Sequence, residues 1–138
     1  MSYKTIRDYF VARLTKQGFQ ESGEMEFVSD GNLKNRFIFR QRELVEERPT
    51  LVDRFQPNRI IEIRLGTPVS DSKVQQAEYT NLQIRIDAFL REVLNPTNFQ
   101  ASSFSIRNLS FQNMSEEIQG VWIQFTLTFK VEDELLYA

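Results

Sequence analysis

The stretch from Val121 to Val131 alternates between apolar and other side chains at every position. Successive side chains of a β-strand point to opposite faces, so strict alternation predicts a strand with one buried face. The other face is expected to be wet or shared with a partner. The apolar set is Val121, Ile123, Phe125, Leu127, Phe129 and Val131, and the opposite set is Trp122, Gln124, Thr126, Thr128 and Lys130.

Three further segments also predict strands. Residues 35–42 and 59–65 alternate in the same way, and a Gly-Thr-Pro sequence follows the second segment. Residues 104–111 predict a strand with a β-bulge, because the alternation shifts between Ile106 and Leu109.

Two segments have helical periodicity. The first carries Ile6, Tyr9, Phe10 and Leu14 on one face. Gly18 and Phe19 after it predict a Schellman end, in which glycine adopts the left-handed conformation. The second helix runs from Lys73 to Leu94 and ends at Asn95-Pro96; its apolar stripe is Leu82, Ile86, Phe89, Leu90 and Val93, widened by Val74, Ala77, Ile84 and Ala88.

The order of these elements is helix, strand, strand, helix, strand, strand. Consecutive strands suit antiparallel pairing, so we predict an α+β fold with a four-stranded, mainly antiparallel sheet and two helices packed on one face. The 138 residues fall within the usual size of one domain, and no linker or repeat divides them. We therefore expect a single domain, residues 1–138.

Residues Glu43 to Pro57 show no clean period and predict a long loop. Large apolar side chains in such a loop would be exposed unless a partner covers them. The C-terminal tip, residues Leu135 to Tyr137, is also apolar and can dock either on the protein's own core or on a partner. Tryptophan is enriched in interfaces, and the lone tryptophan is as plausibly a buried anchor as an exposed ring. The candidate subunit-interface residues are Leu44, Val45, Leu51, Val52, Phe55, Trp122, Leu135, Leu136 and Tyr137.

The chain contains neither histidine nor cysteine. It therefore lacks the usual general base, the commonest transition-metal ligand and any thiolate nucleophile. Its glycines form no phosphate-binding loop. The carboxylates of Glu43, Glu46 and Glu47 lack the spacing of a calcium loop and are interpreted as a solvated or interface cluster. We predict no catalytic, cofactor-binding or metal-ligating residues, and no enzyme.

The balance of charge also limits the possible partners. Seventeen basic and nineteen acidic side chains give a net charge of −2, which disfavours general attraction to nucleic acid or anionic lipid. Arg36, Arg40 and Arg42 fit the outer face of an antiparallel strand, where nearby glutamates are expected to neutralise them. No stretch resembles a signal peptide or a transmembrane helix, so we expect a product of the cytoplasm with no membrane partner.

Several motifs in this order resemble the tail-terminator and neck proteins of long-tailed bacteriophages. The opening helix ends in Leu-x-x-x-Gly-Phe-x-Glu-Ser (Leu14 to Ser22), and a middle strand spans Arg59 to Leu65. The long helix runs into Val-Leu-Asn-Pro (Val93 to Pro96), and Ile-Arg-Asn-Leu-Ser-Phe (Ile106 to Phe111) follows. An acidic, serine-containing turn at Met114 to Ile118 and a long final strand complete the resemblance.

The resemblance implies a virion structural protein without catalytic residues or cofactors, made in the host cytoplasm and located in the virion tail or neck. Such a protein forms a ring, commonly a hexamer, that caps the tail tube and joins it to the head–tail connector protein. Its partners would be itself and the tail tube and connector proteins, with DNA only passing through the lumen. A head-to-tail ring needs two different complementary patches, and the residue 43–57 loop and the C-terminal tip are two candidates.

Three alternatives stay open. A head-completion or connector protein, or a tail-tube subunit, shares the task of ring building. A small module that binds a ligand or peptide belongs to another class, and it would have a concave pocket among Trp122, Gln124 and Thr126. An enzyme would have to use carboxylates, tyrosines or arginines alone.

Overall fold

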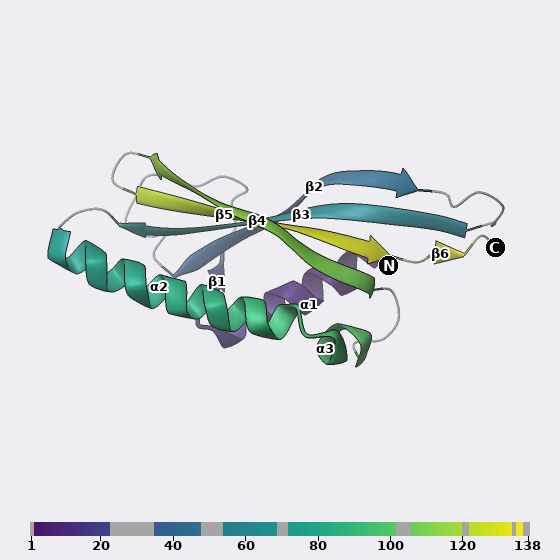
Figure 1. Ribbon diagram of the computed structural model, residues 1–138, viewed down its shortest axis with the longest axis horizontal. Coiled ribbons are helices and arrows are strands. Elements are labelled where there is room, and N and C mark those ends of the chain that lie inside the picture. The colour runs from purple at the N-terminus through teal and green to yellow at the C-terminus, as the bar shows by residue number, and fades with distance from the viewer. Residues whose placement is uncertain are drawn as a thin grey trace.

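The computed structural model describes residues 2–22, 35–47, 54–68, 72–101, 106–119, 122–133 and 135–136, which form one sheet and the helices packed against it (Figure 1). The helices are α1 (Ser2–Lys16), α2 (Ser72–Val93) and α3 (Pro96–Ala101). The strands are β1 (Gln20–Glu21), β2 (Arg36–Glu47), β3 (Arg54–Pro68), β4 (Ile106–Gln119), β5 (Trp122–Asp133) and β6 (Leu135–Leu136).

The sheet has the strand order β1-β2-β3-β5-β4, and β6 pairs with β3 outside this path. β1 is parallel to β2, while the other pairs are antiparallel. The α+β class is therefore confirmed, but the four-stranded prediction is wrong because the sheet is mixed and has five strands in its main path. The missing strand, β1, contains only Gln20 and Glu21, too few residues to show a period.

The three helices lie on one face of the sheet (Figure 1). The prediction of two helices missed α3, which begins at Pro96 directly after the end of the long helix. Proline suits the first turn of a helix, where its missing N–H has no intrahelical acceptor. The side-chain Oδ1 of Asn95 accepts a hydrogen bond from the backbone N–H of Thr97 at 3.0 Å and caps α3.

The end of α1 has the predicted Schellman geometry. Gly18 has a φ of 87°. The backbone N–H of Phe19 donates to the Leu14 carbonyl at 3.2 Å, and that of Gly18 donates to the Thr15 carbonyl at 3.0 Å. Phe19 and Leu14 both join the core, so the motif turns the chain from the helix into β1.

The core lies between the helices and the sheet and is centred on Phe10. Its ring centroid lies 5.1 Å from that of Phe129, 5.6 Å from Phe39 and 6.4 Å from Phe89. The alternation in β5 is confirmed, since the described apolar members of its predicted set are all buried. The stripe of α2 is confirmed in part: Ile84, which was expected to widen it, is 61% exposed.

The predicted loop from Glu43 to Pro57 is wrong, because most of it belongs to a long hairpin. β2 continues to Glu47 and β3 begins at Arg54, and only residues 48–53 lie outside the described part. A β-bulge at Arg42 shifts the register between β2 and β3. The bulge inverts the alternation that follows it, which explains why the sequence showed no clean period there.

β4 shows the same effect. The predicted bulge is confirmed between Ile106 and Asn108, and a second register shift lies between Phe111 and Asn113. The acidic turn expected at Met114 to Ile118 is wrong, because β4 continues through it to Gln119. Two bulges in one strand divide its alternation into short segments, so the sequence did not predict a strand in its second half.

Candidate functional site

The two long hairpins extend to opposite ends of the sheet, and each carries exposed apolar side chains. The β2–β3 hairpin lies at one end and the β4–β5 hairpin at the other (Figure 1). Leu44 and Val45 on β2 are 46% and 38% exposed, and Met114 and Ile118 on β4 are 39% and 69% exposed. Each end therefore offers an apolar surface that the described part of the chain leaves open.

The C-terminal tip does not form a separate patch. β6 pairs with the beginning of β3, with Leu135 opposite Phe55 and Leu136 opposite Arg54. The backbones of the two segments expected to form patches thus pair at one end of the sheet. At the opposite end of the sheet lies the second half of β4, where the sequence predicted a turn.

The other predicted interface residues divide into two groups. Trp122 lies in β5 opposite Pro68 and Gln119, at the β4–β5 end of the sheet, and the structure describes its backbone but not its side chain. Leu51, Val52 and Tyr137 lie outside the described residues.

Both outer strands of the sheet have backbone edges that no described strand covers. β4 is the last strand of the main path and pairs only with β5. On the other side, β1 covers β2 only at Arg36 and Phe37, so the part of β2 from Ile38 to Glu47 is open within the described chain. Edge strands present unpaired N–H and C=O groups that can pair with another strand.

These two edges differ in charge. The open part of β2 carries Arg40 and Arg42 on the sheet face away from the helices, and the last part of β4 carries Glu116 and Glu117. Glu116 accepts a hydrogen bond from the Tyr79 hydroxyl at 3.0 Å, and this bond raises the pKa of Tyr79. The glutamate side chains are exposed, so the β4 edge is open to a basic partner.

A charge cluster occupies the centre of the sheet face away from the helices. Glu62 is only 5% exposed, Arg64 donates to its Oε1 from Nε at 3.0 Å, and Nη2 of Arg64 forms an ion pair with the same oxygen at 2.9 Å. The guanidinium groups of Arg40 and Arg42 lie 3.8 and 3.9 Å from the same carboxylate. The expected neutralisation of the β2 arginines by nearby glutamates is therefore confirmed for Arg40 and Arg42, but three guanidinium groups share one carboxylate.

This face is hollowed beside the charge cluster. A hollow of about 550 Å³ crosses the four long strands and is lined mainly by polar side chains. Its lining includes two of the three residues expected around a ligand pocket, Gln124 and Thr126. The full lining is Arg42, Ile60, Glu62, Arg64, Gln112, Asn113, Ser115, Glu117, Gln124, Thr126 and Thr128.

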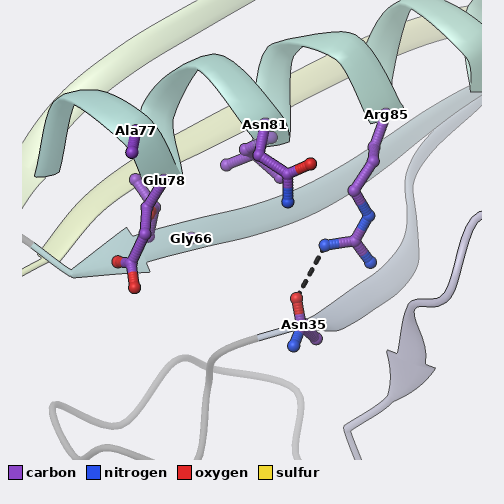
Figure 2. A pocket seen from close by; sticks show the side chains of 8 residues that line it. Asn35, Gly66, Ala77, Glu78, Asn81 and Arg85 are labelled. Atoms are coloured by element: carbon purple, nitrogen blue, oxygen red, sulfur yellow. Dashed lines mark hydrogen bonds between the residues drawn. The ribbon is translucent and has the colours of Figure 1, made fainter. Parts of the chain in front are cut away.

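A second, smaller hollow of about 180 Å³ lies between α2 and the end of the sheet (Figure 2). Arg85 reaches across it and donates from Nη1 to Oδ1 of Asn35 at 2.6 Å and from Nε to the Gln17 carbonyl at 2.9 Å. Its guanidinium carbon lies 3.9 Å from the Phe19 ring centroid, and burial lowers the pKa of Arg85. The hollow is thus crossed by a side chain that ties three segments together, which is a structural role.

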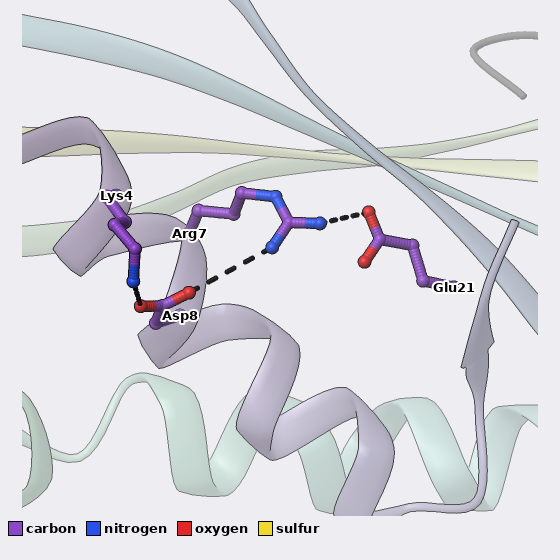
Figure 3. A network of polar contacts seen from close by, with 4 residues as sticks. All are labelled: Lys4, Arg7, Asp8 and Glu21. Carbon is purple, nitrogen blue, oxygen red and sulfur yellow. Dashed lines mark hydrogen bonds and ion pairs between the residues drawn. The ribbon is translucent and has the colours of Figure 1, made fainter. Parts of the chain in front are cut away.

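A polar network near the N-terminus joins α1 to β1 (Figure 3). Arg7 pairs with Glu21, and the hydrogen bond from this pair raises the pKa of Arg7. Lys4 Nζ lies 2.8 Å from Oδ2 of Asp8, which also lies 3.9 Å from Arg7 through its other oxygen. These groups are at least partly exposed, so the network contributes little to stability and mainly orients β1.

Comparison with known proteins adds no relative: no protein-family model matches the chain, and a search of curated proteins finds no match. None of the helices that the structure describes is long and apolar enough to cross a membrane. In the same described ranges, no three acidic side chains gather as a group that could hold a metal ion.

Proposed function

We propose that this chain is a structural protein of a long-tailed bacteriophage virion, a tail terminator whose subunits form a ring on the end of the tail tube. The order of motifs along the sequence suggests the family. The observation that carries the ring is the pair of uncovered sheet edges, which differ in sequence and charge. A ring with head-to-tail contacts requires two such different surfaces on each subunit.

The strand directions allow the sheet to continue from one subunit to the next. Because each of the pairs β2–β3, β3–β5 and β5–β4 is antiparallel, β2 runs opposite to β4. The β2 strand of a second copy can therefore add to β4 as an antiparallel neighbour without inverting the sheet. Both open edges become paired, and closure of the ring leaves no edge free for uncontrolled aggregation.

The observed register suggests how the two edges meet. Arg40, Glu62, Thr128 and Asn113 lie in one row across the sheet, so a second copy added without a slide would place its Arg40 opposite Asn113. Strands of a closed sheet are staggered, and a slide of four residues keeps every side chain on its own face. This slide places Arg40 of one copy opposite Glu117 of the other.

The same slide matches the remaining features of the two edges. It brings Leu44 of one copy opposite Met114 of its neighbour, so two exposed apolar side chains cover each other. It also brings Gln119, the last residue of β4, opposite Ile38, the first β2 residue that β1 leaves uncovered. The proposed interface therefore pairs opposite charges on one face and apolar groups on the other.

In this proposal the ring, commonly of six subunits, stops tube polymerisation and presents its other side to the head–tail connector protein. Its partners are other copies of itself, the tail tube protein and the connector, while DNA passes through the lumen. A head-completion protein or a tail-tube subunit would build its ring through the same kind of edges. Binding of purified tubes to one side of the ring distinguishes a terminator from these rivals.

Cysteine cross-linking tests the proposed contact directly, because the natural chain has no cysteine. The double variant Leu44→Cys with Met114→Cys should form disulfides between subunits on mild oxidation, giving a ladder of covalent multimers that ends at a closed ring. A mixture of the two single variants should give heterodimers only. Cross-linked homodimers from either single variant in equal yield would contradict a head-to-tail contact.

The open-face hollow favours a second candidate function, a module that binds a small ligand or peptide. Gln124 and Thr126 line the hollow, as expected for such a module. This candidate does not need the sheet edges to meet, so it predicts a stable single chain. Failure of the cysteine pair to cross-link, together with a saturable ligand in the hollow, would favour it over the ring.

A further inference from the structure

The hollow on the open face is produced by two β-bulges at the same level of the sheet. Arg42 is the extra residue of β2 opposite Ile60 and Ile61, and Gln112 is the extra residue of β4 opposite Thr128 and Phe129. Because Ile61 pairs with Phe129, the two bulges flank one row of the sheet. Bulges bend a strand and redirect its side chains, and both extra residues line the hollow.

On one side of the hollow, three guanidinium groups surround a single carboxylate, that of Glu62. Arg64 gives Glu62 one hydrogen bond, from Nε, and an ion pair through Nη2, and a guanidinium group has five N–H donors. Arg40 and Arg42 lie at 3.8 and 3.9 Å from Glu62, which is within ion-pair range but beyond a hydrogen bond. Donors of all three arginines thus remain available to a second anion.

The floor of the hollow adds two uncharged polar side chains. Gln124 and Thr128 are 7% and 6% exposed, and both line the hollow. The amide of Gln124 and the hydroxyl of Thr128 can each donate a hydrogen bond to an anion in the hollow.

We propose that the hollow binds the carboxylate or phosphate group of a small polar ligand. Arg42 and Arg64 hold the anion beside Glu62, Arg40 adds positive charge at the rim, and Gln124 and Thr128 bind from the floor. Glu117 lines the β4 side, so the uncharged or cationic part of the ligand extends toward that strand. This site lies within one chain, and it does not depend on the proposed ring.

Titration with inorganic phosphate and with acetate, followed by NMR of the arginine side-chain N–H and backbone amide signals at constant ionic strength, tests the site. Saturable shifts at Arg42, Arg64 and Gln124 are expected, and the tighter of the two probes identifies the preferred anion. Arg42→Gln should weaken binding by about tenfold or more, because charge-assisted hydrogen bonds to the anion are lost.

Three further variants should give different results. Glu62→Gln should tighten phosphate binding, because it removes the competing carboxylate, while Arg91→Gln removes an exposed charge on α2 and should change nothing. Arg42→Lys keeps the charge without the planar fork and should bind more weakly than the natural chain. Shifts that do not saturate, or equal weakening by Arg91→Gln and Arg42→Gln, would overturn the proposal.

Discussion

Replacing Arg85 by methionine should destabilise the fold by more than is usual for a side chain that is only partly buried. The substitution removes hydrogen bonds to Asn35 Oδ1 and the Gln17 carbonyl, together with the cation–π contact to Phe19. A hydrogen bond from a charged group contributes about 1.5 kcal/mol or more, and a partly exposed cation–π contact about 0.5–1 kcal/mol. The bond to Asn35 is exposed and contributes less than this, and methionine retains much of the apolar stem, so the expected loss is about 2–3 kcal/mol.

Urea unfolding at one fixed protein concentration measures this loss. With a slope of about 2 kcal/mol per M, the midpoint should fall by about 1 M or more. Arg85→Lys keeps the charge but not the fork and should show more than half of the effect. Arg91→Met, on the exposed side of the same helix, is the matched control and should stay within about 0.5 kcal/mol of the natural chain. An equal midpoint for Arg85→Met and the control would refute the reasoning.

Two further substitutions test the core and its titration. Phe10→Ala should cost about 3–5 kcal/mol and lower Tm by about 10–20 °C in calorimetry, because the ring is fully buried among Phe39, Phe89 and Phe129; a shift below about 3 °C would contradict the packing. The hydroxyl of Tyr9 donates to the Val93 carbonyl at 2.8 Å, and burial raises the pKa of this hydroxyl. Above the ordinary pKa of 10.0 the unfolded chain therefore binds fewer protons than the folded one, so the stability of the fold falls as the pH rises. Tyr9→Phe should lower the urea midpoint by losing this bond and make it fall less steeply as the pH rises above about 10; unchanged steepness would contradict the assignment.

Local patterns in the sequence were enough to predict the elements that follow one period without interruption. The alternation of β5 placed Phe125 and Phe129 in the core, and Gly18 with Phe19 predicted the end of α1. In these elements the backbone geometry and the buried face depend on the same few neighbouring residues. These elements can therefore be predicted from their own residues alone.

Elements that depend on distant partners could not be predicted in this way. β1 and β6 are two-residue strands that exist because β2 and β3 offer them an edge. The bulge at Arg42 inverted the pattern of β2, so Leu44 and Val45 were interpreted as loop residues rather than edge residues. Their exposure was nevertheless expected, and among the predicted interface residues whose side chains the structure describes, both are exposed.

The open-face site shows the same limit. Glu62 lies between the apolar residues Ile61 and Ile63 in an alternating strand. It is buried because Arg40 and Arg42 from β2 and Arg64 from β3 surround it, and this arrangement depends on the strand register. Two bulges at one level, on strands far apart in the sequence, could not be recognised as a pair before the sheet was known.

The mass of the natural protein in solution, measured by light scattering behind a sizing column over a wide range of concentration, tests the central claim most directly. The account predicts a discrete species of about six times 16.3 kDa, or a single chain that converts to that mass as concentration rises. Glu117→Arg, which places like charges at the proposed contact, should shift the mass toward the single chain. A mass of 16.3 kDa at every concentration, unchanged by Glu117→Arg, would contradict the ring.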